Sequence, residues 1–71
     1  MAETETVGEA LPREMARVRD EVMPVYLAIG PGGAPALAMM RADLDRAAKA
    51  LVEGDTAEMI MRLISLRGWT L

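Results

Sequence analysis

Apolar residues recur at spacings of three and four along residues 35–53, which is the pattern of one face of an amphipathic helix. These apolar positions are Leu37, Met40, Leu44, Ala47 and Leu51. The opposite face carries charges that alternate in sign at every fourth residue, namely Arg41, Asp45, Lys49 and Glu53. Such a charge ladder is typical of a solvated helix surface. Pro35 suits the first turn, where its missing N–H group costs nothing.

A second helix follows almost at once. Gly54 can adopt the left-handed conformation that ends a helix, and Asp55 is a favourable N-cap with Glu58 three residues later. The predicted helix covers residues 56–67, ends at Gly68 and carries a wide apolar arc formed by Met59, Ile60, Leu63, Ile64 and Leu66. A connection this short predicts two helices that lie side by side in a tight antiparallel hairpin.

The N-terminal half predicts one more helix, which begins near Pro12 and extends to residue 29. Its apolar positions keep a heptad register through Leu11, Met15, Val18, Val22, Val25 and Ile29. We expect this row of apolar residues, the first-helix seam, either to pack on the chain's own hairpin or to pair with a second copy of the chain. Pro24 either kinks the helix or ends it near Val22, and the continued register favours a kink.

Two segments outside the predicted helices have no apolar periodicity. Residues 1–10 are acidic and rich in threonine, which predicts a disordered tail before a single helical domain over residues 11–71. Residues 30–35 form a glycine and proline linker that turns the chain between two helices. This linker lacks the Lys and Ser/Thr of a phosphate-binding loop.

The composition restricts how such a chain can be stabilised. It has 71 residues, one Tyr, one Trp, no Phe and neither Cys nor His, so disulfides and Cys/His zinc sites are excluded. A chain of this size buries only about 60 % of the surface that its unfolded form exposes. We therefore expect an all-α three-helix domain with a kinked first helix that completes its core as a homodimeric bundle.

The charge distribution argues against nucleic-acid binding. The net charge is −3, and Glu3, Glu5 and Glu9 supply three of the eleven acidic residues, which leaves eight acidic residues against eight basic ones. The helical part therefore has no net basic field. The alternative is a helical dimer that binds RNA or DNA through a basic stripe on the first helix, made of Arg13, Arg17 and Arg19.

Catalytic chemistry has few candidates in this sequence. Without His or Cys, the chain offers Ser65 and Lys49, and Ser65 lies among apolar residues with no candidate base. Asp43 and Asp45 are two residues apart, so on a helix they point in different directions. We expect no enzymatic activity, no cofactor and no metal site.

The remaining function class is protein interaction. Seven methionines are many for a chain of this length, and methionine adapts well to varied partners. The predicted interface combines the first-helix seam with later residues, and its members are Met15, Val18, Val22, Val25, Ile29, Met39, Met61 and Trp69. The absence of a ~20-residue apolar run and of an apolar signal core predicts a cytoplasmic protein that does not enter a membrane.

Overall fold

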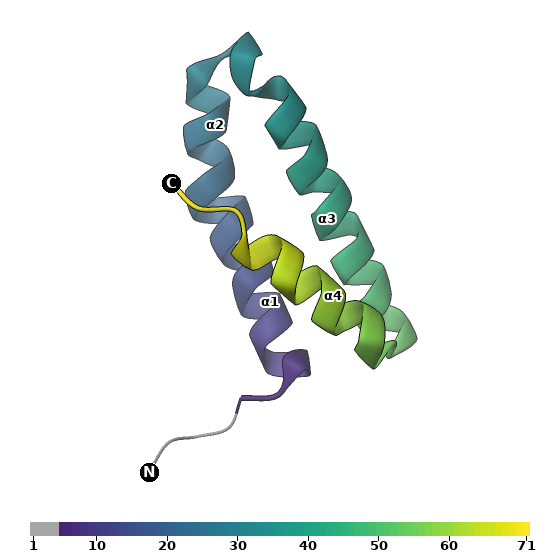
Figure 1. The fold of residues 1–71 in the computed structure, drawn as a ribbon. Coiled ribbons are helices and arrows are strands. Elements are labelled where there is room, and N and C mark those ends of the chain that lie inside the picture. The colour runs from purple at the N-terminus through teal and green to yellow at the C-terminus, as the bar shows by residue number, and fades with distance from the viewer. Residues whose placement is uncertain (1–4) are drawn as a thin grey trace.

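The computed structural model describes residues 5–71, and this range folds into three helices without any strand (Figure 1). The first helix is continuous and consists of α1 (Val7–Arg17), the π-helical stretch η1 (Val18–Val22) and α2 (Met23–Ile29). A 3-10 turn, η2 (Pro31–Gly33), leads into α3 (Ala34–Glu53), and α4 (Thr56–Arg67) follows. The predicted all-α, three-helix fold is confirmed.

The first helix begins at Val7, earlier than the predicted start near Pro12. Thr6 and Glu9 form a capping box, in which the Thr6 hydroxyl accepts from the Glu9 amide and the Glu9 carboxylate accepts from the Thr6 amide, both at 3.2 Å. The Thr6 hydroxyl also donates to the Glu9 carboxylate at 2.8 Å, and this bond, together with the one from the Thr6 amide, lowers the pKa of Glu9. The predicted disorder is therefore wrong for residues 7–10, while residues 1–4 lie outside the described range.

Pro24 does not break the first helix, because η1 changes the helical pitch just before it. The Met23 amide donates to the Val18 carbonyl, five residues back instead of four. This wider turn shifts the register by one residue, so Met23 and Tyr26 turn towards the core and are half-buried. Val25 and Ile29 turn outward and are 45 % and 61 % exposed. The prediction that the heptad register continues to Ile29 is wrong for this reason.

The junction between α3 and α4 is as short as predicted. Gly54 adopts a left-handed conformation with φ of 68°, and the Asp55 amide donates to the Ala50 carbonyl at 3.1 Å. The Asp55 carboxylate then accepts from the Glu58 amide at 3.1 Å and caps α4. Glu58 does not complete the capping box, because its carboxylate lies 3.1 Å from Arg62 instead.

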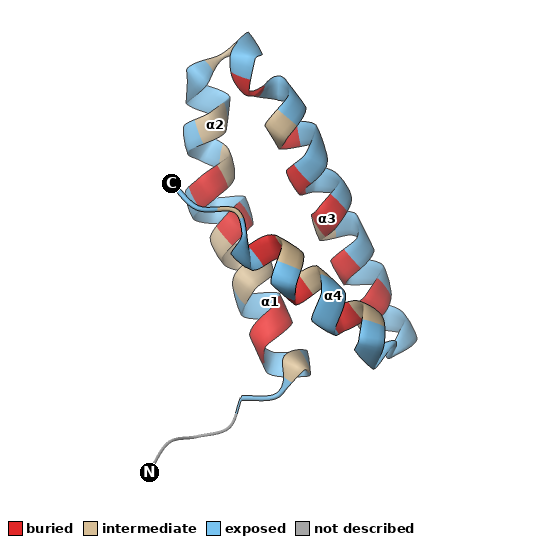
Figure 2. Cartoon of the chain, in the orientation of Figure 1, coloured by how far each residue is buried: buried red, intermediate tan, exposed pale blue. Residues whose placement is uncertain are grey.

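The three helices form a flat triangle. The first helix and α3 diverge from the η2 turn, and α4 lies between their far ends, where it packs on α1 and α3 (Figure 1). The buried side chains lie along the inward faces of α1, η1, α3 and α4, and α2 has none (Figure 2). The fully buried large side chains are Leu11, Val18, Val22, Met40 and Leu66. The triangle measures 41 × 30 × 15 Å, and its radius of gyration of 12.9 Å exceeds the roughly 11 Å of a compact domain of this length.

Candidate functional site

Asp43 is the one buried charged residue in the described part of the chain, at 9 % exposure. It lies on the inward face of α3, in phase with four buried apolar residues, namely Leu37, Met40, Ala47 and Ala50. The buried seam of α3 therefore includes a carboxylate at a position where a core side chain would be expected. A buried carboxylate is costly unless hydrogen-bond donors surround it.

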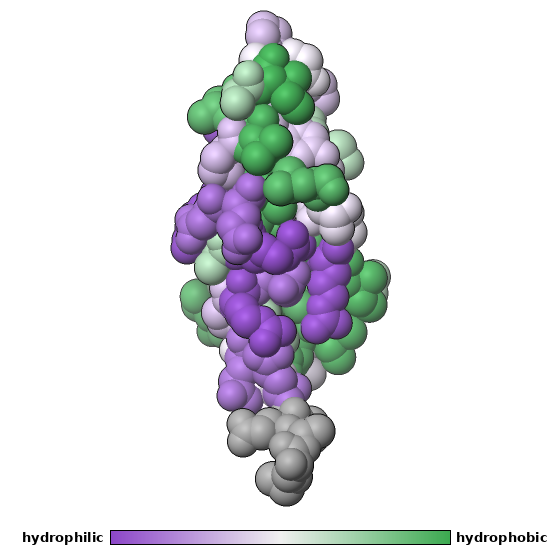
Figure 3. Space-filling model, turned by 90° about the vertical axis from the view of Figure 1, so that its left-hand side faces the viewer, coloured by the Kyte–Doolittle hydropathy of each residue, from purple (hydrophilic) through white to green (hydrophobic). Residues whose placement is uncertain are grey.

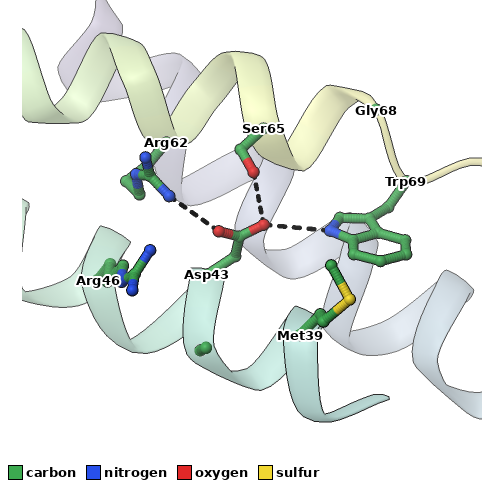
Figure 4. Close-up of a pocket in the computed structure, with 8 residues that line it drawn as sticks. Met39, Asp43, Arg46, Arg62, Ser65, Gly68 and Trp69 are labelled. Atoms are coloured by element: carbon green, nitrogen blue, oxygen red, sulfur yellow. Dashed lines mark hydrogen bonds and ion pairs between the residues drawn. The ribbon is translucent and has the colours of Figure 1, made fainter. Parts of the chain in front are cut away.

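Three donors from α4 and the C-terminal tail meet the Asp43 carboxylate (Figure 4). Arg62 Nη1 donates to Oδ1 at 2.9 Å, and the Ser65 hydroxyl donates to Oδ2 at 2.6 Å. Trp69 Nε1 donates to Oδ2 as well, at 3.2 Å. Because all three donors lie 19 to 26 residues further along the chain, the carboxylate fastens both α4 and the tail to α3.

Trp69 extends this cluster to the first helix. Its ring meets the Tyr26 ring edge-on, with 6.4 Å between the centroids and an interplanar angle of 83°. Trp69 is half-buried and packs against the core. The tail after Gly68 therefore folds back across the bundle, and Trp69 links α2 to α3 through Tyr26 and Asp43.

A shallow hollow of about 550 Å³ opens beside the Asp43 cluster, with Met39 and Arg46 on its rim (Figure 4). Four of the residues that line the hollow belong to this hydrogen-bonded cluster, namely Asp43, Arg62, Ser65 and Trp69. Arg62 also lies 3.1 Å from Glu58, although its buried Nε does not point at that carboxylate. The cluster has the contacts of a structural anchor, since the Asp43 carboxylate on α3 accepts hydrogen bonds from two side chains of α4 and one of the C-terminal tail.

The three first-helix arginines do not form a basic stripe, because each pairs with a carboxylate of its own chain. Arg13 lies 2.7 Å from Glu5, and Arg19 holds Asp20 through two hydrogen bonds of 2.9 and 3.0 Å. The hydrogen bond from Arg19 lowers the pKa of Asp20, and the same bond raises the pKa of Arg19.

Arg17 has a structural role that links the first helix to α4. Its Nη2 donates to the Leu66 carbonyl at 3.0 Å, where α4 ends. Its Nε donates to the Glu14 carboxylate at 3.0 Å. Glu21, four residues after Arg17, could also pair with it by helical spacing, but the structure shows Glu14 as the partner. An arginine at the C-terminal end of a helix stabilises carbonyl groups that have no partner within the helix.

The residues predicted for an interface fall into two groups. Val18 and Val22 are fully buried within the single chain, and Met15 and Trp69 are half-buried against the same core. These four are occupied by intrachain packing. The other four are exposed to between 45 and 61 % and lie on three different helices: Val25, Ile29, Met39 and Met61.

The exposed apolar side chains define two surfaces. The α4 face consists of Ala57, Ile60, Met61 and Ile64, and its three large side chains are 46, 55 and 62 % exposed. The α2 face consists of Val25, Leu27 and Ile29, with Leu27 at 65 %. In Figure 3 the upper part of the molecule, over α2, is hydrophobic, whereas the surface over α1 is hydrophilic. Ile60 and Ile64 are absent from the predicted interface, although the wide apolar arc of this helix already indicated more than one contact surface.

No protein-family model, curated protein or solved structure matches the chain. Within residues 5–71, no group of three or more acidic side chains could hold a metal ion. None of the described helices is both long enough and apolar enough to cross a membrane. The α4 face and the α2 face are therefore the features of this chain that bear on its function.

Proposed function

We propose that this chain is a small, non-catalytic cytoplasmic protein that serves as an oligomerisation and protein-interaction module, with a second copy of itself as its first partner. The observation that carries the proposal is the α4 face. On α4 the side chains of Met59, Leu63 and Leu66 fill the core, and yet the opposite side of the same helix is also apolar. A helix that is apolar on both sides is typical of a buried helix.

The energetics favour a partner on this surface. Full burial of an aliphatic side chain gains about 1.5–3 kcal/mol, and the α4 face holds three large ones that are about half exposed. The flat triangle supports the same conclusion, because a thin arrangement buries less apolar surface within one chain than a compact bundle does. A second copy would cover the exposed side of α4 and thicken the core.

The α2 face supports a further protein partner. Beside it, Met23, Pro24, Leu27 and Leu37 line a small apolar pocket of about 210 Å³, and Arg19 and Arg41 lie at its rim. A pocket of this kind suits one apolar anchor side chain from a partner segment that carries an acidic group next to the exposed Arg41. This surface would remain available in a dimer that forms through α4.

Nucleic-acid binding finds less support. The arginines of the predicted stripe, Arg13, Arg17 and Arg19, each have a carboxylate partner between 2.7 and 3.0 Å away, so the surface around them has little net positive charge to attract phosphate. To bind phosphate, Arg17 would also have to release the Leu66 carbonyl at the end of α4. No other observation favours this function.

Two aspartate substitutions at matched exposure test the proposal. Ile64 on the α4 face is 62 % exposed and Leu27 on the α2 face is 65 % exposed. We expect Ile64→Asp to weaken self-association at least tenfold in sedimentation equilibrium, because it places a charge in the contact between two copies. Leu27→Asp should leave the dimer mass unchanged. Equal self-association of Ile64→Asp and the unmodified chain, or a monomeric unmodified chain, would contradict the proposal.

A further inference from the structure

We infer that the α4 faces of two copies pair antiparallel, around a two-fold axis that passes between residues 60 and 61. This inference rests on the proposed self-association and specifies its geometry. A two-fold axis makes the same face serve both copies. In this register Ile60 of one copy lies opposite the partner's Met61, and Ala57 lies opposite the partner's Ile64.

The sizes of the side chains favour the antiparallel arrangement. The α4 face is asymmetric along the helix, with the small Ala57 near its start and the large, 62 % exposed Ile64 near its end. Antiparallel pairing sets a large side chain against a small one at both ends of the contact. Parallel pairing would set Ile64 against the partner's Ile64 and leave a gap between the two alanines.

The charges favour the same arrangement. The exposed Arg67 lies near the end of α4, and the exposed Glu53 and Asp55 flank Gly54 just before its start. In the antiparallel register Arg67 lies opposite the partner's Gly54, between two carboxylates of that copy. Parallel pairing would place the two copies of Arg67 together, and like charges at a contact are unfavourable. The helix dipoles of α4 also align favourably only when the helices are antiparallel.

A dimer of this kind would cover a definite share of the surface of each chain. An interface of ordinary size buries roughly 800 Å² on each partner. That is about a sixth of the 4690 Å² that the chain exposes. The α4 face lies at the centre of this contact, and the end of α3 with Glu53 flanks it.

Cysteine cross-linking tests the register directly, because the natural chain contains no cysteine. Disulfides need Cα atoms within about 7 Å of each other. After mild oxidation, we expect the Met61→Cys variant to cross-link with itself, since position 61 lies beside the axis. The Ala57→Cys variant should not cross-link with itself, because seven residues of helix, or about 10 Å, separate position 57 from its own copy along the axis. A mixture of Ala57→Cys and Ile64→Cys chains should yield the cross-linked heterodimer.

The other outcomes separate the inference from the proposed function. Self-cross-linking of Ala57→Cys would establish a parallel pair and overturn the antiparallel register, while self-association would stand. A dimer mass without cross-links at any of these positions would show that the two copies meet through another surface, and this result would also overturn the inference. A monomer mass for the unmodified chain would overturn the inference and the proposed function together.

Discussion

Replacement of Asp43 by alanine is expected to lower the free energy of unfolding by about 3–5 kcal/mol, the range found when one partner of a buried ion pair is removed. The side chains of Asp43 and Arg62 are only 13 and 15 % exposed. Without the carboxylate, Arg62, Ser65 and Trp69 would all lose their acceptor, and Arg62 would keep a charge in partly buried surroundings. Since small domains are stable by only about 5–15 kcal/mol, this single change would remove a large part of the free energy of unfolding.

The Asp43 prediction can be measured by urea denaturation at a fixed protein concentration. Asp45→Ala is the matched control, because it removes the same carboxylate from an exposed position on the same helix. We expect the control to change stability by no more than about 0.5 kcal/mol. Trp69 is the only tryptophan and gives a second readout. In Asp43→Ala its emission should shift to longer wavelength as the tail loosens. Equal denaturation midpoints for Asp43→Ala and Asp45→Ala would show that the cluster does not stabilise the fold.

Replacement of Gly33 by alanine is expected to destabilise the chain by about 3 kcal/mol, near the upper end of the usual cost of overpacking. An added Cβ at position 33 would lie 2.2 Å from the Tyr26 carbonyl oxygen and 3.1 Å from its carbon. Gly33 has an ordinary φ of −86°, so the requirement is for space and not for backbone freedom. Because the obstructing atoms belong to the backbone of α2, they cannot move aside cheaply, and the η2 corner would have to open.

The neighbouring glycine provides the control for this second prediction. An added Cβ at Gly32 would come no closer than 3.8 Å to another heavy atom, from the Ile29 side chain. Gly32→Ala should therefore be neutral, or stabilising by about 0.4–1 kcal/mol through the unfolded state. Thermal denaturation followed by circular dichroism compares the two variants. If Gly33→Ala unfolded at the same temperature as Gly32→Ala, the close approach of η2 to α2 at this corner would be refuted.

The features that depend on local backbone chemistry could be predicted from the sequence. Gly54 and Asp55 mark the α3–α4 junction, Gly68 marks the end of α4, and Pro35 lies in the first turn of α3, all as expected. Each of these signals is contained within a few residues, because capping uses amide and carbonyl groups of a single helical turn. The start of α1 has a local signal of the same kind, the capping pair Thr6 and Glu9. The acidic composition of the first ten residues favoured a disordered tail instead, so this signal did not enter the prediction.

The register of the first helix after Pro24 could not be predicted from apolar spacing. Leu11, Val18 and Val22 follow the heptad pattern into the core, whereas Val25 and Ile29 do not. A proline offers no N–H group, and here the preceding turn widens to accommodate it. One additional residue in that turn is enough to move every later side chain to another face of the helix. The apolar pattern contains no signal for this change.

The Asp43 cluster depends on contacts between distant segments. A carboxylate in a helix is normally expected on the solvated side, and Asp43 is buried because three donors further along the chain converge on it. Arg17 is a similar case, since its main-chain acceptor Leu66 lies 49 residues away. Such pairings follow from the tertiary arrangement, and the sequence pattern of either helix alone does not indicate them.

Self-association of the chain through an apolar surface that its own fold leaves uncovered can be measured from its mass in solution. Light scattering should be recorded over a dilution series, with helicity followed by circular dichroism on the same samples. We expect twice the mass of one chain at high concentration and a fall towards the mass of a single chain on dilution. A folded chain that remains monomeric at every concentration, with its α4 face exposed to water, would contradict this expectation.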